Sequence, residues 1–213
     1  MIRATLGEQI DIHTGGIEHI AIHNNNEIAQ SEAVTGRCPL ARFWMHRAHI
    51  QLGNSKIAKS EGNIVYLSEI IARGIHPLAL RYLFLGAHYR STSNFSWEAL
   101  EASETAFLRL RALADSLPKG GVPPATYRTR IHQRINDDLD ISGALAVIWE
   151  MIKDKNLNPS AIRAGLIDAD RVLGLGLDSE DTQAKEACVK RFGVQVGLMT
   201  LPPSVKSRIK ARA

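Results

Sequence analysis

The stretch EQIDIHTGGIEHIAIHNNNEIAQSEAVTG, residues 8–36, carries the patterns that decide the fold of the amino-terminal part. Its segments EQIDIH and IEHIAIH alternate apolar and polar residues, which predicts two short half-buried strands. The Thr14-Gly15-Gly16 run between them predicts a turn. A helix is expected from Asn26 to Thr35, ended by Gly36. The pattern therefore indicates a small α/β unit.

The same stretch places His23 and Glu27 four residues apart. At this spacing two side chains share one face of a helix. Imidazole nitrogen and carboxylate oxygen both bind zinc, but two ligands do not complete a tetrahedral site. On spacing alone, a surface or capping pair is the commoner outcome, and the metal interpretation stays open.

Beyond this stretch the chain becomes helical. FWMHRAHIQL (43–52) is expected to form a short strand, and PKGGVPP (118–124) is the best candidate for a linker. Five segments have the apolar period of a helix: 65–74, 76–90, 95–117, 140–155 and 158–174. These patterns predict a mainly α protein, in which a small α/β piece precedes an antiparallel helical bundle.

Caps and apolar stripes give these helices their boundaries. Pro77 is expected in a first turn, Ser96 as an N-cap, and the aspartates at 137, 138 and 140 as N-terminal capping residues. Three of the predicted helices have an apolar face that is expected to point inward. These faces are Leu67, Ile70 and Ile71 in 65–74; Leu100, Phe107, Leu110, Ala114 and Leu117 in 95–117; and Ile141, Leu145, Ile148 and Ile152 in 140–155.

Composition sets the broad class. The chain has 213 residues, 45% hydrophobic and 23% charged, which is typical of a globular protein. It has no apolar run of the ~20 residues that span a bilayer. The sequence shows no secretory signal, and its two cysteines, Cys38 and Cys188, lie far apart. We therefore expect a reducing, cytoplasmic setting without a membrane partner.

Charge is compatible with a polyanionic partner but does not require one. The net charge is +4, with basic clusters at 127–134 and 205–213. A solvated helix face and a basic tail are the simpler interpretations.

Lys56 and Lys59 in NSKIAKSEGN (54–63) likewise allow two interpretations: they could close over a polyphosphate, or belong to an ordinary exposed loop.

Several blocks, taken together, resemble one family. DIHTGGIEHIAIHNNNEIAQSEAVTG, FWMHRAHIQL, KIAKSEGN, LRYLFLGAHYRSTSNFS and INDDLDISGALAVIWEMI resemble cysteinyl-tRNA synthetase, in order and spacing, from about Leu6 to about Leu177. The resemblance implies a class I aminoacyl-tRNA synthetase that activates cysteine with ATP and Mg²⁺ and transfers it to tRNA-Cys. Zinc in that family binds the substrate thiolate, and a metal that prefers thiolate to hydroxyl can separate cysteine from serine.

The resemblance also implies roles for individual residues. His23 and Glu27 match the first histidine and last glutamate of the family's His-His-Glu-Asn-Glu block, which are zinc ligands. Residues 56–60 match its Lys-Met-Ser-Lys-Ser loop, so Lys59 is expected to contact ATP beside Lys56, although Ile-Ala replaces Met-Ser. Asn24 and Asn25 depart from the block as well.

The implied domains follow the chain. Residues 1–63 resemble the C-terminal part of the catalytic domain, the remnant that holds the zinc-ligand helix and the lysine loop. Residues 64–117 resemble stem-contact helices, 118–124 a linker, 125–178 an anticodon-side bundle and 179–213 a polar tail.

The family's nucleotide-binding half and its two zinc cysteines have no counterpart in the sequence. We therefore expect the chain alone to be inactive and a separate N-terminal half to be a candidate partner. A non-catalytic tRNA-binding paralogue and a ligase joining cysteine to a small molecule remain alternatives. The histidines at 13, 19, 46, 49 and 88 are expected to pack or to form hydrogen bonds, and the tryptophans at 44, 97 and 149 to occupy core or helix-seam positions.

Overall fold

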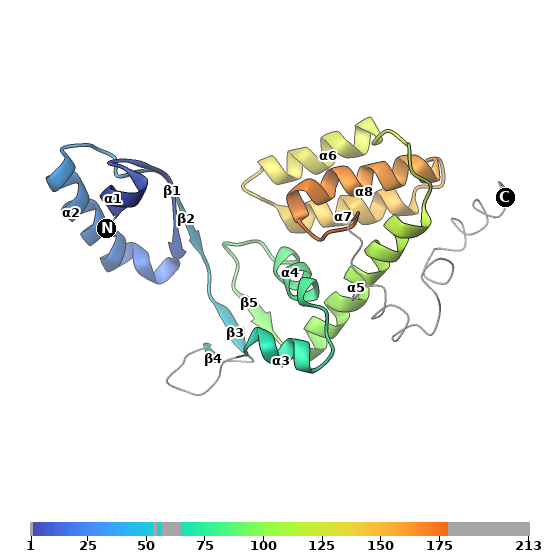
Figure 1. The fold of residues 1–213 in the computed structure, drawn as a ribbon, viewed down its shortest axis with the longest axis horizontal. Coiled ribbons are helices and arrows are strands. Elements are labelled where there is room, and N and C mark those ends of the chain that lie inside the picture. Colours follow the sequence, from blue (N-terminus) through green and yellow to red (C-terminus); the bar gives the residue numbers. More distant parts are fainter. Residues whose placement is uncertain (1, 53–54, 57–64, 179–213) are drawn as a thin grey trace. The chain divides into compact units, whose positions relative to one another are not determined.

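The computed structural model describes residues 2–52, 55–56 and 65–178 (Figure 1). The chain divides into two compact units, each considered by itself. Unit 1 comprises residues 1–57 with 89–94, and unit 2 comprises residues 58–88 with 95–213. The lysine at 59 and the basic cluster 205–213, both singled out in the sequence, lie outside the described residues.

Unit 1 is built on a parallel strand–helix–strand arrangement. Strand β1 (Ile10–Gly16) pairs in parallel with β2 (Ala41–Arg47), and helix α2 (Asn25–Thr35) lies between them in sequence. Gly36 ends α2 as predicted, with φ 67° in the left-handed region that favours glycine. The short helix α1 (Ile2–Leu6) precedes β1.

Three further strands complete unit 1. β3 (Ile50–Leu52) lies between β4 (Ser55–Lys56) and β5 (Ser93–Phe95) in a separate small sheet. The single strand expected over 43–52 is thus two strands, β2 and β3, which belong to different sheets.

Two predictions in this region are wrong. Thr14-Gly15-Gly16 is the end of β1, not a turn. A Cβ on Gly16 would lie 2.3 Å from Glu18 Oε2, the end of a flexible side chain. IEHIAIH is not a strand but two helical turns, η1 (Ile17–His19) and the π-type η2 (Ile20–Asn24), because the chain winds directly into α2.

In the described part of unit 2, the regular elements are helices except for the end of β5. Its helices are α3 (Leu67–Ala72), α4 (Pro77–Leu85), α5 (Trp97–Ser116), α6 (Ala125–Asn136), α7 (Ile141–Lys153) and α8 (Pro159–Leu173). The last three form the bundle that Figure 1 draws in yellow and orange. The prediction of a mainly α chain with a small α/β piece is confirmed.

Most of the predicted capping residues begin these helices, but the prediction is wrong for Asp137 and Asp138: Asp137 is the C-cap of α6, and Asp138, with φ 49°, lies in the connection before Asp140, the N-cap of α7. Pro77 occupies the first turn of α4, Ser96 Oγ accepts a hydrogen bond from Ala99 N (3.1 Å), and Asp140 Oδ1 accepts one from Gly143 N (2.8 Å). At the other end of the bundle, the Asp170 carboxylate accepts hydrogen bonds from Leu175 N (2.7 Å) and Leu177 N (2.8 Å), which fixes the turn after α8.

One continuous hydrophobic core holds unit 2 together. The α5 stripe predicted from the sequence is buried throughout. Of the predicted α7 face, Leu145, Ile148 and Ile152 are buried and Ile141 is partly buried. The prediction is wrong for two residues of α3, since Leu67 and Ile71 are exposed and only Ile70 is buried. α3 is a helix of 6 residues, too short to bury more than one position of its apolar face.

Candidate functional site

The carboxyl ends of β1 and β2 open into a hollow. In open α/β sheets ligands bind beyond the carboxyl ends of parallel strands. Here a cavity of about 670 Å³ lies at that edge. Its lining includes Thr14, Gly15, Gly16, Glu18, Arg47 and His49. The two glycines leave backbone rather than side chains at the cavity wall, so a ligand could approach the strand ends closely.

His23 and Glu27 do share one face of the helical segment. His23 Nε2 lies 3.5 Å from Glu27 Oε2, and the two side chains are 56% and 22% exposed. The two potential ligands therefore lie close together on a part-exposed surface. Their predicted role as metal ligands stays a prediction.

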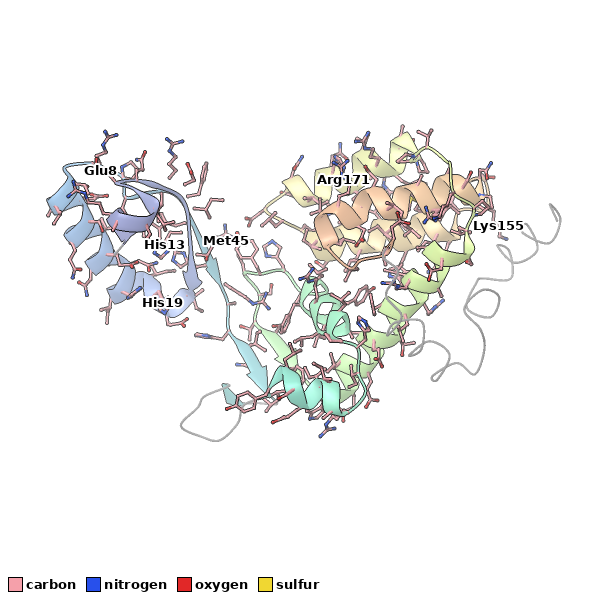
Figure 2. The ribbon with its side chains drawn as sticks, in the orientation of Figure 1. Glu8, His13, His19, Met45, Lys155 and Arg171 are labelled. Carbon is pink, nitrogen blue, oxygen red and sulfur yellow. The ribbon has the colours of Figure 1, made fainter. Side chains whose placement is uncertain are left out.

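The nearest partner of Glu27 is His13, which the sequence predicted to pack or to form hydrogen bonds without indicating with which residue. His13, which projects from β1 toward α2 and is labelled in Figure 2, places Nε2 2.7 Å from Glu27 Oε2. Its ring stacks on Trp44 of β2, with centroids 4.4 Å apart. Strand pairing explains the stack, because His13 and Trp44 are register partners. Glu27 is thus positioned by β1 and β2 together.

A second polar pair lies beside the first. Asn24 is buried, and its Nδ2 lies 2.6 Å from His46 Nε2. The His46 ring is parallel to Trp44, with a centroid distance of 6.2 Å. Within the described residues, Asn24 Oδ1 and His13 Nδ1 are buried without a hydrogen-bond partner. Buried polar atoms are rarely unpaired, so these two atoms are candidates for contact with a ligand or water.

The donor set fits only part of a zinc site. In the described portion of the chain, no three His, Cys, Asp or Glu side chains gather so that they could hold a metal ion. His23 and Glu27 have the right chemistry for two of the four ligands of a tetrahedral zinc. The remaining ligands would have to come from residues outside this set.

The structure describes little of the lysine loop. Lys56 pairs with Gln51 through the backbone of β4 and β3. Its side chain and the whole of Lys59 lie outside the description, so their expected contact with ATP stays a prediction.

The basic cluster at 127–134 lies on α6, and its arginines are already paired. Arg128 Nε lies 3.1 Å from Asp168, Arg130 lies 2.5 Å from Glu150, and Arg134 lies 3.2 Å from Asp140. These pairs lie within the bundle and are largely exposed. The cluster therefore does not form a free cationic patch, in line with its simpler interpretation as a helix face.

Comparison with known proteins connects these features. The family described as tRNA synthetases class I (C) catalytic domain matches residues 1–105. A cysteine–tRNA ligase 1 of Burkholderia lata is 46% identical over 173 residues, which cover 81% of this chain and 36% of that protein. A cysteine–tRNA ligase of Novosphingobium aromaticivorans is 36% identical, covering 98% of this chain and 45% of the relative. The chain thus spans less than half the length of these curated relatives.

A solved structure agrees on the fold. The LeuRS chain of a ternary complex with tRNA and LeuAMS from Agrobacterium radiobacter K84 superimposes with a TM-score of 0.58 at 14% identity, covering 90% of this chain and 29% of that one. Among the described residues, no helix has both the length and the apolar character to cross a bilayer.

The sequence similarity to the cysteine–tRNA ligases and the shared fold lead to one conclusion: the chain belongs to the cysteinyl-tRNA synthetases, in the class I synthetase family.

Proposed function

We propose that the chain takes part in charging tRNA-Cys with cysteine, with ATP and Mg²⁺ as co-substrates. The observation that carries this proposal is the 46% identity to a cysteine–tRNA ligase over 173 residues. The polar pairs around Glu27 and the cavity at the strand ends support it, because they supply a place for an amino acid and a nucleotide.

His23 and Glu27 are the proposed zinc ligands. Bound zinc would hold the cysteine thiolate, which a serine hydroxyl cannot replace. His13 donates to Glu27 and so fixes the carboxylate, as partners of metal ligands commonly do. Lys56 and Lys59 are proposed to bind the phosphates of ATP and to neutralise charge on the departing pyrophosphate.

Further protein surface is proposed to cover the β1–β2 sheet. Ile12 and Phe43 are register partners on one face and are 62% and 68% exposed. Parallel sheets are normally covered on both faces. We propose that a separate N-terminal half of the catalytic domain covers this face and supplies the missing zinc ligands.

The helical regions complete the proposal. Residues 64–117 are proposed to contact the tRNA stem and residues 125–178 to form the anticodon-side bundle. Residues 118–124 join these regions, and residues 179–213 follow as a tail.

The test is cysteine-dependent ATP–pyrophosphate exchange. We expect none from the 213-residue chain alone, and exchange after co-expression with the amino-terminal part of the Burkholderia lata relative that precedes the matched region. Glu27→Gln should abolish exchange in the mixture. The amide can still accept from His13, but it is a poor zinc ligand.

Glu69→Gln, an exposed change on α3, serves as the control and should leave exchange intact. Exchange that survives Glu27→Gln would count against a zinc role for Glu27. Binding of tRNA without exchange, in every mixture, would favour the non-catalytic alternative.

A further inference from the structure

A second cavity, in unit 2, lies far along the chain from the site described above. It occupies about 310 Å³ between the 118–124 segment and α8, and we call it the linker–α8 pocket. Lys119, Gly120 and Gly121 line it from the segment, and Ser160, Arg163 and Arg171 from the helix. Figure 2 labels Arg171 on α8.

The charge of this pocket is unbalanced. Within the described residues, Lys119 and Arg171 are exposed and form no ion pair, unlike the paired arginines of α6. Asp168 also lines the pocket, but its carboxylate is taken by Arg128 Nε (3.1 Å) and His132 Nε2 (3.7 Å). Two free cations therefore face a cavity whose one carboxylate is already neutralised.

The segment also offers backbone donors. The N–H groups of Gly120 and Gly121 donate no hydrogen bond to any described residue. Gly120 has φ 85°, a left-handed conformation of the kind that turns successive N–H groups toward one anion. Cationic side chains combined with free backbone N–H groups are the usual elements of a phosphate site.

The pocket is preformed rather than loose. Gly121 packs so tightly on the first turn of α8 that a Cβ would lie 2.1 Å from Ser160 O. Arg163 donates from Nε to Ala114 O (2.8 Å) and pairs with Asp178, which holds the pocket wall. Pro118 and Pro123 restrict the segment at both ends.

From these features we infer that the linker–α8 pocket binds a phosphate group, either of a small phosphate ester or of an RNA backbone. Lys119 and Arg171 would supply the charge, and the Gly120 and Gly121 N–H groups the directed hydrogen bonds. The inference does not depend on the reaction proposed for unit 1.

The test uses the full chain labelled with ¹⁵N in glycine and titrated with inorganic phosphate. The Gly120 and Gly121 amide resonances should shift saturably. Lys119→Gln/Arg171→Gln should weaken the affinity about tenfold or more, because charge-assisted hydrogen bonds are lost. Lys153→Gln/Lys155→Gln removes two exposed charges outside the pocket and should leave the affinity within about twofold, since distant exposed charges are screened.

Resonances that stay in place at millimolar phosphate would overturn the inference, as would equal weakening in both double variants. Gly121→Ala provides a second test, because it displaces the segment while keeping every charge, and it should also weaken binding. Unchanged affinity in that variant would refute a built site. A short RNA that moves the same two resonances at lower concentration than phosphate would assign the ligand to an RNA backbone, whereas tighter binding of a free phosphate ester would assign it to a small molecule.

Discussion

Replacing His13 with phenylalanine tests whether β1 positions Glu27. Phenylalanine keeps a ring against Trp44, where the present centroid distance is 4.4 Å. It removes the 2.7 Å contact from His13 Nε2 to Glu27 Oε2. Among the described residues, the carboxylate would then keep His23 as its partner, at 3.5 Å. The change therefore isolates one hydrogen bond between the strand and the helix.

The structure allows its size to be worked out. A hydrogen bond to a charged group contributes about 1.5–3 kcal/mol, and a carboxylate that water still reaches takes the lower half of that range. The substitution also removes His13 Nδ1, buried without a partner among the described residues, which offsets about 1 kcal/mol. The net loss of local stability is about 1 kcal/mol, or about fivefold in the opening equilibrium.

Amide hydrogen exchange measures this directly. Peptides covering β1 and β2 should exchange about fivefold faster in His13→Phe than in the parent chain. His19→Phe is the matched control, because its contact with Glu18 is 3.9 Å long between half-exposed side chains and should contribute close to nothing. If both variants exchange alike, Glu27 is not held by β1 and the positioning role of His13 is wrong.

Three further predictions concern unit 2 and are measured by chemical denaturation. Asp170→Ala should destabilise the bundle by about 3 kcal/mol, because two backbone N–H groups after α8 lose a charged acceptor. The control Asp115→Ala changes an exposed position of α5 and should cost below about 0.5 kcal/mol. Asp140→Ala should cost about 1 kcal/mol near neutral pH, because the N-cap of α7 is lost. The hydrogen bond from Gly143 N lowers the pKa of Asp140 below its ordinary value. The stabilisation by the cap should therefore be complete above the ordinary carboxyl range and fade as the pH falls through the lowered pKa. Burial raises the pKa of Tyr82, whose hydroxyl accepts from Trp149 Nε1 (3.0 Å), so the chain should lose stability as pH rises past about 10, and Tyr82→Phe should remove that alkaline loss.

Helix boundaries were predictable because they depend on local chemistry. Ser96, Asp140 and Gly174 act on backbone groups within a few residues of themselves, so a short window of sequence contains the whole interaction. The strand prediction over IEHIAIH failed for the opposite reason. Alternating isoleucines indicate a strand only if a neighbouring strand is there to pair with, and the chain continues into α2 instead.

At the candidate site, too, the local contact was predictable from the sequence and the long-range contacts were not. His23 and Glu27 are separated by four residues, so helical geometry alone predicted that they share a face. His13 and Glu27 are separated by fourteen residues and meet only because β1 lies against α2. Likewise, Asn24 reaches His46 through the parallel pairing of β1 and β2, which a single sequence does not specify.

The two units differ in how they are stabilised, and the difference bears on assembly. Unit 2 has a continuous core, whereas few hydrophobic residues of unit 1 are fully buried, chiefly Leu40, Ala41 and Ala48. Covering the exposed parts of Ile12 and Phe43 would contribute about 2–4 kcal/mol at the usual value for burying such side chains. That amount is a large fraction of the stability of a small domain. A covering segment would therefore stabilise the strands that carry His13 and Trp44, so completing the sheet and ordering the Glu27 site would be one energetic event.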